Sequence, residues 1–291
     1  MKSSAKLRAL LNKPDIVVAP GAYDGITARL VEQAGFPAVY MTGAGTSMAR
    51  GFPDFGLLSM SEMVENAGVM ARSIDVPLIS DADTGYGNEL NVTRSVREFE
   101  TRGVAGIHIE DQVSPKRCGH LDGKVIVSQD EFISKIRAAV AARRDPDFLI
   151  IARTDARAVT GFDDAIQRAN AALKAGADMA FVEAVQTADE LAAVPLRVEG
   201  PCLLNVVPGG KTPRISMGEA QSLGYRLAIH PGVLLGAVIV AADQALQKLK
   251  ETGAQANIPQ GATVMDTFRR FGADEWNALR RRFAEDEQRH G

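Results

Sequence analysis

The chain has 291 residues, of which 46% are hydrophobic and 24% charged, and its formal net charge is −3. This composition is typical of a folded protein with a full core and excludes a disordered chain. The small negative charge, with no long basic run, disfavours nucleic-acid binding, because neutralising phosphates requires clustered lysines and arginines.

The cysteine content and the apolar runs of the sequence indicate the cellular compartment of the protein. The two cysteines, Cys118 and Cys202, provide no disulfide framework, which fits a reducing cytoplasm. No apolar run approaches the ~20 residues that a membrane span requires, and residues 1–11 lack an apolar leader segment. We therefore expect a cytoplasmic protein with no membrane partner.

Short apolar runs alternate with helix-like stretches along most of the chain. The expected strands are Ile16–Ala19, Ala38–Met41, Pro77–Ser80, Ala105–Ile109, Phe148–Ala152, Met179–Val182, Cys202–Val206 and Arg226–Ile229. The expected helices between them include Gly25–Ala34, Ser61–Ser73, Asn91–Arg102, Glu131–Ala142, Asp163–Ala175 and Ala188–Leu196. Several of these stretches are followed by a glycine just before the next strand, which is the usual left-handed helix stop.

The strand runs are apolar almost throughout, which indicates parallel strands covered on both faces. Roughly eight strand–helix units in about 250 residues are typical of an α/β protein with a (β/α)8 TIM barrel. A doubly wound open sheet is the alternative, but no G-x-G-x-x-G turn follows the first strand. We predict that residues 1–255 form the barrel and that residues 256–291 form a C-terminal helical extension.

Two helices are expected in that extension, over Thr263–Phe271 and Asp274–Gln288. The second has Trp276, Leu279 and Phe283 at helical spacing. Such an apolar stripe needs a partner surface, which we expect on another subunit.

Acidic residues follow two neighbouring strands of the predicted barrel, whose carboxyl ends meet at one mouth. Asp81 and Asp83 have the i, i+2 spacing of one strand face, and Glu110 ends the next strand. Carboxylates this close repel one another unless a cation lies among them. Oxygen ligands suit Mg²⁺ or Mn²⁺. The alternative is that Asp81 and Asp83 only begin the loop that continues with Thr84–Gly87.

A loop after the fourth expected strand contains a second group of side chains suited to catalysis. Cys118 is flanked by Lys116, Arg117 and His120, surroundings that favour a thiolate. The cysteine is a candidate nucleophile or a general acid/base, and an ordinary exposed thiol is the alternative. Cys202 lies in an apolar strand and is expected to pack in the core.

The chain resembles a known family, the isocitrate lyase/phosphoenolpyruvate mutase superfamily. The resemblance rests on Asp81–Gly87, His108–Gln112, Lys116–His120, Ile151–Ala156, Glu183–Ala184 and Asn205–Val206. These segments occur in order over nearly the whole chain. Short lyases of the superfamily, such as 2,3-dimethylmalate lyase and methylisocitrate lyase, match the length.

The resemblance implies a Mg²⁺ site, with Mn²⁺ possible in its place. The residue matching Asp81 binds the ion directly, and those matching Asp54, Asp83 and Glu110 hold it mostly through water. It also implies a homotetramer with a swapped C-terminal helix.

The resemblance further implies that the Lys116–His120 loop is a mobile gate. Its Cys118 acts as the general acid, with Lys116, His120, Arg153 and Glu183 completing the catalytic set. The substrate contacts implied in the same way are Tyr40, Thr42, Gly43, Ala44, Gly119, Arg153, Asn205 and Thr212. The general base that removes the hydroxyl proton is either Tyr40 or a group of the metal shell.

The implied reaction is cleavage of a carbon–carbon bond in a 2-hydroxy di- or tricarboxylate, giving an α-keto acid and a second carboxylate. The stretch Asn205–Pro213 is similar to that of 2,3-dimethylmalate lyases, although Pro208 stands where that group often has glutamate. A 2-alkylmalate such as 2,3-dimethylmalate is therefore the expected substrate. The alternatives are 2-methylisocitrate cleavage to pyruvate and succinate, oxaloacetate hydrolysis, and a non-catalytic barrel that binds keto acids.

Overall fold

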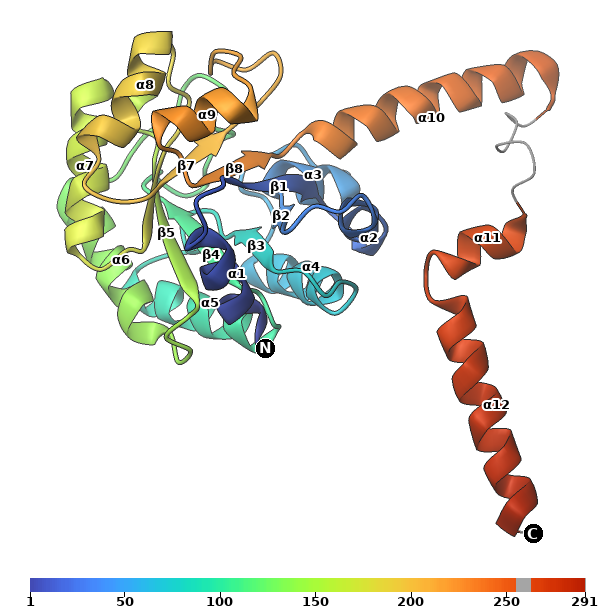
Figure 1. Cartoon of the computed structure of the whole chain (residues 1–291). Helices are drawn as coiled ribbons and strands as arrows, with labels where there is room; N and C mark the ends of the chain where they lie inside the picture. The colour runs from blue at the N-terminus through green and yellow to red at the C-terminus, as the bar shows by residue number, and fades with distance from the viewer. Residues whose placement is uncertain (255–262, 291) are drawn as a thin grey trace. The chain divides into compact units, whose positions relative to one another are not determined.

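In the computed structural model, which describes residues 1–254 and 263–290, eight parallel strands close into a barrel in chain order (Figure 1). The strands are β1 (Val17–Ala22), β2 (Val39–Met41), β3 (Leu78–Asp81), β4 (Gly106–Glu110), β5 (Leu149–Thr154), β6 (Met179–Val182), β7 (Cys202–Asn205) and β8 (Leu227–His230). Strand β1 pairs with both β2 and β8, and the pairing of Val17 with Leu227 closes the ring. The predicted TIM barrel is confirmed.

Helices surround this barrel (Figure 1). They are α1 (Ser3–Leu11), α2 (Gly25–Gln33), α3 (Gly43–Ala49), α4 (Met60–Ala71), α5 (Glu89–Thr101), α6 (Gln129–Ala142), α7 (Phe162–Lys174), α8 (Ala188–Arg197) and α9 (Met217–Leu223), with a short 3-10 turn, η1 (Ala156–Ala158). The six predicted helices are present, with ends shifted by one or two residues. Helices α1, α3 and α9 are not among the predicted stretches.

Local sequence signals explain where the helices begin and end. Side-chain oxygens of Asp24, Ser59 and Ser216 each accept a hydrogen bond from a backbone N–H in the first turn of the helix that follows. At the other end, the predicted glycine stops have positive φ; Gly224, for example, has φ of 104°. Glycine tolerates this left-handed conformation because it has no β-carbon.

The barrel interior is filled by alternate residues of the strands. Its apolar layer includes Ala19, Tyr40, Ile79, Ala105, Leu149, Ile151, Met179, Phe181, Leu203, Leu227 and Ile229. The residues between them face outward and pack under the helices, as Val39, Met41 and Ile150 do. Both faces of each strand are therefore buried, which is why the strand sequences lack polar alternation.

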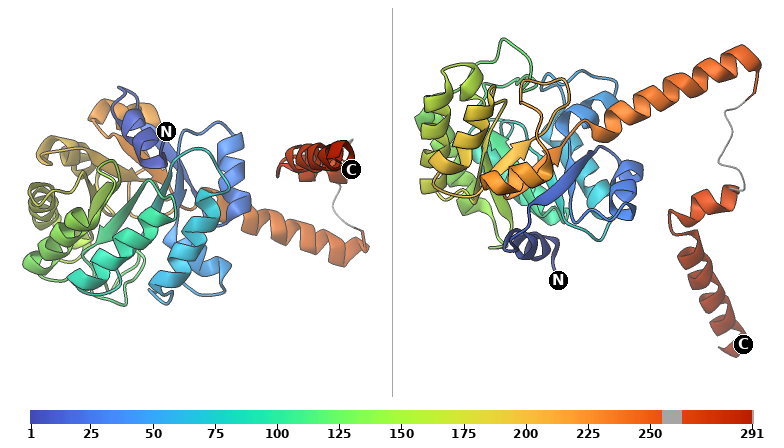
Figure 2. Two further views of the ribbon diagram at one scale, coloured as in Figure 1. Left: turned by 90° about the horizontal axis from the view of Figure 1, so that it is seen from below. Right: turned by 45° about the horizontal axis from the view of Figure 1, so that its top comes forward.

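Helix α1 covers the amino-terminal ends of the strands, at the opposite end of the barrel from the candidate site (Figure 2). Leu7 is fully buried against the inner layer. Arg8 donates from Nη2 to Asp178 Oδ1 at 2.7 Å and from Nε to the carbonyl oxygen of Asp147 at 3.1 Å. Both partners precede strands, so the helix closes this end of the barrel.

The chain divides into two units, Met1–Ala237 and Val238–Gly291. Helix α10 (Val233–Thr252) spans the boundary, and the second unit also contains α11 (Val264–Arg269) and α12 (Ala273–His290). Both predicted tail helices are present, whereas the predicted boundary after residue 255 lies outside the described residues. Within the part of the chain that the structure describes, no helix is long and apolar enough to cross a membrane.

Candidate active site

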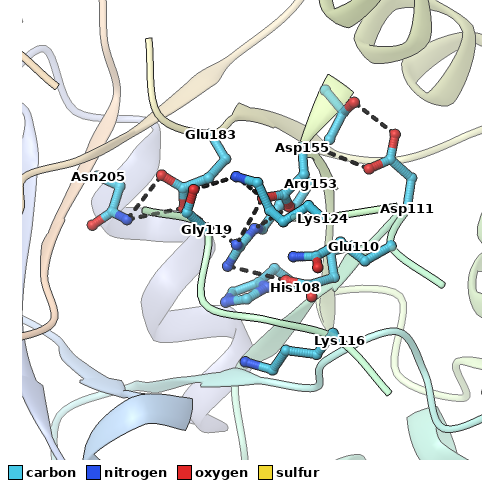
Figure 3. A network of polar contacts seen from close by, with 12 residues as sticks. His108, Glu110, Asp111, Lys116, Gly119, Lys124, Arg153, Asp155, Glu183 and Asn205 are labelled. Atoms are coloured by element: carbon cyan, nitrogen blue, oxygen red, sulfur yellow. Dashed lines mark hydrogen bonds and ion pairs between the residues drawn. The ribbon is translucent and has the colours of Figure 1, made fainter. Parts of the chain in front are cut away.

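The alternation of the strands explains how distant residues meet at one end of the barrel. Inward-facing apolar residues of the core layer are followed two positions later by a polar residue that faces the same way. The pairs are Tyr40 and Thr42, Ile79 and Asp81, Ile151 and Arg153, Phe181 and Glu183, and Leu203 and Asn205. The carboxyl ends of the strands therefore surround a polar centre, part of which Figure 3 shows.

A cavity of about 180 Å³ opens at this end. It is lined by Tyr40, Thr42, Ala44, Asp54, Asp81, Lys116, Cys118, Gly119, His120, Arg153, Glu183, Asn205, Val207, Pro231, Gly232 and Leu235. Most predicted site residues are in this lining; Gly43, Asp83, Glu110 and Thr212 are not. Asp83 and Glu110 are buried and contact the lining cations Lys116 and Arg153. Sequence reasoning did not find the apolar members Val207, Pro231 and Leu235.

Lys116 lies among the predicted metal-binding carboxylates. Its Nζ is 2.7 Å from Asp54 Oδ1 and 3.0 Å from Asp83 Oδ1. The expectation that Asp81 and Asp83 share one strand face is wrong, because β3 ends at Asp81 and Asp83 has a φ of 46°. The chain turns there, and the backbone N–H of Asp83 donates to Asp81 Oδ1 at 2.9 Å.

The four predicted metal-binding carboxylates, Asp54, Asp81, Asp83 and Glu110, are called the acidic cluster below. Two of them, Asp81 and Asp83, have pKa shifts in opposite directions. Burial acts to raise the pKa of Asp81, but His108, Lys116 and Arg153 outweigh it and lower that pKa to about 2. Burial raises the pKa of Asp83 to about 6, with Lys116 opposing the shift and Asp81 adding to it. Asp81 is therefore a permanent anion at neutral pH.

The acidic cluster fits a hard divalent cation. Asp83 Oδ1 is paired with Lys116 Nζ at 3.0 Å, and Glu110 Oε2 lies 3.1 Å from Arg153 Nη1, but neither carboxylate oxygen of Glu110 accepts a hydrogen bond. Buried oxygens without donors are costly unless something else satisfies them. Among the side chains described, those of residues 1–254 and 263–284, no three His, Cys, Asp or Glu side chains are placed to hold an ion by themselves. Buried carboxylates such as Asp81, Asp83 and Glu110 are hard oxygen ligands of the kind that Mg²⁺ takes together with waters.

Arg153 forms the centre of the polar network (Figure 3). Its guanidinium lies 3.1 Å from Glu110 Oε2 and 3.5 Å from Glu183 Oε2, and its Nε donates to Asp155 Oδ2 at 3.0 Å. The guanidinium carbon is also 5.2 Å from the ring centre of Phe181. These contacts hold the planar cation at the cavity wall, where it is placed to bind a carboxylate.

The predicted gate lies over the cavity and contacts a second loop. His120 Nε2 is 3.3 Å from Glu183 Oε1, and His120 Nδ1 accepts a hydrogen bond from the backbone N–H of Lys211 at 3.0 Å. Lys211 Nζ also lies 2.6 Å from Asp122 Oδ1. The β4–α6 loop and the β7–α9 loop are therefore joined in this conformation.

The expectation of an easily formed thiolate at Cys118 is not met. The thiol is largely buried, and this burial raises its pKa above the ordinary value, although a backbone N–H contact at His120 opposes the shift. A protonated thiol is a proton donor and a poor nucleophile. Of the two roles left open by the residues, this favours the general acid.

Tyr40 and His108 form a buried pair beneath the cavity. Tyr40 Oη and His108 Nε2 are 2.8 Å apart. Burial lowers the pKa of His108 to about 4 and raises the pKa of Tyr40 well above its ordinary range. Both groups are neutral at pH 7, and the direction of the hydrogen bond between them depends on which imidazole nitrogen carries the proton.

Backbone donors complete the site at the start of α3. Thr42 caps this helix, its Oγ1 accepting from the backbone N–H of Gly45 at 3.4 Å. A β-carbon at Gly43 would lie 2.4 Å from Asp81 Oδ2, so this position requires glycine. Free N–H groups at a helix start favour an anion.

Two buried residues near the cavity carry no role in the sequence prediction. Lys124 lies on the β4–α6 loop, four residues after the Lys116–His120 gate, and Asp155 follows β5; their side chains are paired at 3.0 Å. Asp155 continues the inward alternation two positions after Arg153, which is the signal that identifies it. Lys124 has no such signal, because loop residues have no fixed periodicity.

Comparisons with known proteins agree with this geometry. The phosphoenolpyruvate phosphomutase family matches residues 7–250. The 2,3-dimethylmalate lyase of Eubacterium barkeri is 46% identical over 280 residues, covering 96% of this chain and 94% of the relative. The 2-methylisocitrate lyase of Aeropyrum pernix is 45% identical over 252 residues, covering 87% and 81%.

Solved structures give the same result. Oxaloacetate acetylhydrolase in complex with 3,3-difluorooxalacetate is similar with a TM-score of 0.92 and 39% identity, covering 96% of both chains. Phosphonopyruvate hydrolase in complex with oxalate and Mg²⁺ is similar with a TM-score of 0.88 and 30% identity, covering 98% of this chain and all of the other.

Proposed function

The chain belongs to the phosphoenolpyruvate mutase/isocitrate lyase superfamily, and from this membership we propose that it is a Mg²⁺-dependent carbon–carbon lyase for 2-alkylmalates such as 2,3-dimethylmalate. The observation that carries the proposal is the placement of the Cys118 thiol and the Arg153 guanidinium in the lining of one cavity beside the acidic cluster. A binding protein for keto acids would have no use for a proton donor on a loop over its site.

The reaction requires the C2–C3 bond to break, the C2 hydroxyl proton to be removed by Tyr40 or a group of the metal shell, and one proton to be delivered to C3. In 2,3-dimethylmalate, the bond between C2 and C3 breaks, C2 becomes the keto carbon of pyruvate, and C3 takes the electron pair as the carbanion of propionate. We assign delivery of a proton to C3 to Cys118. The gate holds this thiol at the cavity and excludes water that would otherwise compete as a proton donor.

Other residues orient the substrate. Arg153 and the backbone N–H groups of Gly43 and Ala44 would bind the carboxylate that becomes the keto acid's. Tyr40, which is hydrogen-bonded to His108 and lines the cavity, would contact the substrate hydroxyl. Asn205 and Thr212 would face the second carboxylate. Asn205 already donates to Glu183 Oε2 at 3.0 Å, which fixes its amide.

The metal site would be formed by Asp81, Asp83, Glu110 and Asp54. Mg²⁺, or Mn²⁺ in its place, would supply Lewis-acid stabilisation of negative charge on the hydroxyl and carboxylate oxygens. The support on this chain is the buried carboxylate oxygens that lack hydrogen-bond donors. Phosphonopyruvate hydrolase, which shares the fold, binds Mg²⁺.

The cavity favours a substrate with two carboxylates over one with three. Its lining cations, Lys116 and Arg153, already lie within ion-pair distance of carboxylates of the protein. Val207 and Leu235 contribute apolar surface, which suits an alkyl substituent. Metal-dependent release of pyruvate from 2,3-dimethylmalate, compared with 2-methylisocitrate and oxaloacetate, tests this assignment.

The second unit supports a homo-oligomer, which we propose to be a tetramer that exchanges its C-terminal helices. Trp276 and Phe283 of α12 are 71% and 60% exposed, and Phe268 of α11 is 57% exposed. Large apolar side chains that cluster on one surface are typical of an interface. Light scattering on the double variant Trp276→Ser/Phe283→Ser should give a smaller assembly than the parent, and an unchanged mass would contradict the exchange.

The setting we propose is the cytoplasm. Cys118 and Cys202 are both free thiols, and a reactive free thiol at the cavity is best preserved in a reducing compartment.

A further inference from the structure

Lys124 is a buried lysine on the β4–α6 loop, the loop that contains the Lys116–His120 gate. It is not one of the catalytic residues described above. The side chain of Lys124 is 1% exposed, and its Nζ lies 3.0 Å from Asp155 Oδ1. The same Nζ also donates to the backbone carbonyl oxygen of Gly119. Moving an ammonium group out of water is costly, and these two acceptors are what compensate it here.

Asp155 connects this lysine to the substrate-binding arginine. Its Oδ2 accepts from Arg153 Nε at 3.0 Å, and its Oδ1 faces both Lys124 Nζ and Arg153 Nη2. Its backbone N–H donates to Asp111 Oδ1 at 2.8 Å, so the carboxylate is anchored to the barrel. Figure 3 shows the amino group of Lys124 between Gly119 and Asp155, with Arg153 beside Asp155.

Gly119 connects these contacts to the proposed general acid, Cys118. Gly119 follows Cys118 directly, and its carbonyl oxygen is the acceptor for Lys124. The site thus has a continuous set of contacts that runs from the barrel through Asp155 and Lys124 to the peptide unit next to the general acid. Lys124 lies five positions after Gly119 in the chain, so the contact closes the β4–α6 loop on itself as well as onto the barrel.

We propose that Lys124 is a positioning residue that holds the Cys118–Gly119 turn closed on Asp155, and so places the Cys118 thiol at the reacting carbon. The proposal rests on the proposed function, because it takes Cys118 as the general acid. Lys124 itself does not touch the substrate; it acts through the main chain of Gly119. Removing its ammonium group frees the turn and leaves Arg153 and Asp155 paired with each other.

A second buried lysine provides a matched control. Lys135 is 5% exposed and pairs with Glu131 at 3.0 Å one turn away on α6, where it contacts no residue of the gate. Lys124→Met and Lys135→Met therefore both remove a buried, paired ammonium group. Only the first removes a contact with the gate.

The first experiment measures how well the gate shields Cys118, with no need for turnover. The full chain and its Lys124→Met and Lys135→Met variants are treated with iodoacetamide in Mg²⁺ and oxalate, and alkylation is followed by peptide mass spectrometry. We expect Cys118 to react at least about tenfold faster in Lys124→Met, since reaction follows exposure of the thiol, and at the parent rate in Lys135→Met. Cys202, buried in β7, reports on global unfolding. Equal Cys118 rates in all three proteins would overturn the proposal.

The second experiment separates positioning from folding. In Lys124→Met we expect kcat to fall by about 100-fold, the effect of a small misplacement of a reacting group, with KM nearly unchanged. In a Cys118→Ser background the same change should cost less than about threefold, because residues that act as a unit are not additive. Losses that multiply would overturn the proposal. Lys124→Gln repeats both experiments if the methionine variant does not fold.

The two failures are distinguishable. If the parent enzyme releases no keto acid, the proposed function fails, and the alkylation rates still report on Lys124. If the parent enzyme is active but Cys118 is equally protected in all variants, only the positioning role fails.

Discussion

Gly119 of the gate lies directly against Arg153 in the barrel. A β-carbon on Gly119 would come within 2.5 Å of Arg153 Nη2 and within 2.6 Å of Glu183 Cγ. Gly119 does not have the positive φ that would by itself require glycine. The residue is small because two catalytic side chains occupy the space that any larger residue would need.

This contact predicts the effect of Gly119→Ala. Overpacking costs about 1–3 kcal/mol, which corresponds to a loss of roughly five- to 150-fold in kcat/KM if the gate must close for turnover. The melting temperature should barely change, because the strain is relieved by opening the loop. Gly218→Ala is the control, since a β-carbon there meets no atom within 4 Å. Wild-type turnover in Gly119→Ala would show that the gate does not close as seen here.

The assignment of Cys118 as general acid predicts a selective loss in Cys118→Ser. Proton transfer from a positioned group contributes about 10² to 10⁴ in rate, and serine is a far weaker acid than cysteine. We expect kcat to fall by that factor with KM nearly unchanged, because the thiol acts in the transition state. Steady-state kinetics on the preferred substrate measure this, and an unchanged kcat would remove Cys118 from the mechanism.

The raised pKa of Cys118 predicts its pH dependence. Burial favours the protonated thiol, so the general acid should remain active at neutral and mildly alkaline pH. Activity should be lost as pH rises through a value above the ~8.5 of a free cysteine. The sign for stability is the same: the raised pKa makes folding less favourable only at alkaline pH. Alkylation of Cys118 should rise over that pH range, and a midpoint below neutrality would contradict the protonated state.

The acidic cluster predicts how metal binding responds to substitution. Asp81→Ala removes the proposed direct ligand, and we expect the dissociation constant for Mg²⁺ or Mn²⁺ to rise by at least about 100-fold. Glu110→Gln should have a smaller effect, about tenfold, if it acts through water. Isothermal titration calorimetry measures both. Parent affinity in Asp81→Ala would place the metal elsewhere.

The sequence was sufficient to predict the barrel and most of the cavity lining. Apolar strands such as Ala105–Ile109 and Met179–Val182 follow helices that end at the glycines Gly103 and Gly176, and parallel strands bring their carboxyl ends together whatever the loops do. Asp81, Arg153, Glu183 and Asn205 could be grouped for that reason. The prediction for Asp83 was wrong in its detail, because a strand ending at Asp81 and the left-handed turn after it are not visible as periodicity.

Residues that depend on loop conformation could not be predicted. Lys124 is an ordinary loop lysine in the sequence, and only the fold brings it to Asp155. Val207 and Leu235 line the cavity from the loop after β7 and the first turn of α10, where no repeating pattern fixes their direction. The raised pKa of Cys118 could not be predicted from the sequence either, because it depends on how the loop buries the side chain. The neighbouring cations in the sequence indicate a thiolate, whereas burial of the side chain favours the thiol.

The most direct test of the proposed function is release of α-keto acid from a panel of substrates, with Mg²⁺ and with chelator. The panel contains 2,3-dimethylmalate, 2-methylisocitrate, isocitrate, oxaloacetate and phosphonopyruvate, with acetate and oxalate assayed separately for oxaloacetate. We predict pyruvate from 2,3-dimethylmalate, abolished by chelator and restored by Mg²⁺, at a kcat/KM above those of the other substrates. Turnover without metal, or no turnover of any carboxylate in the panel, would contradict the account.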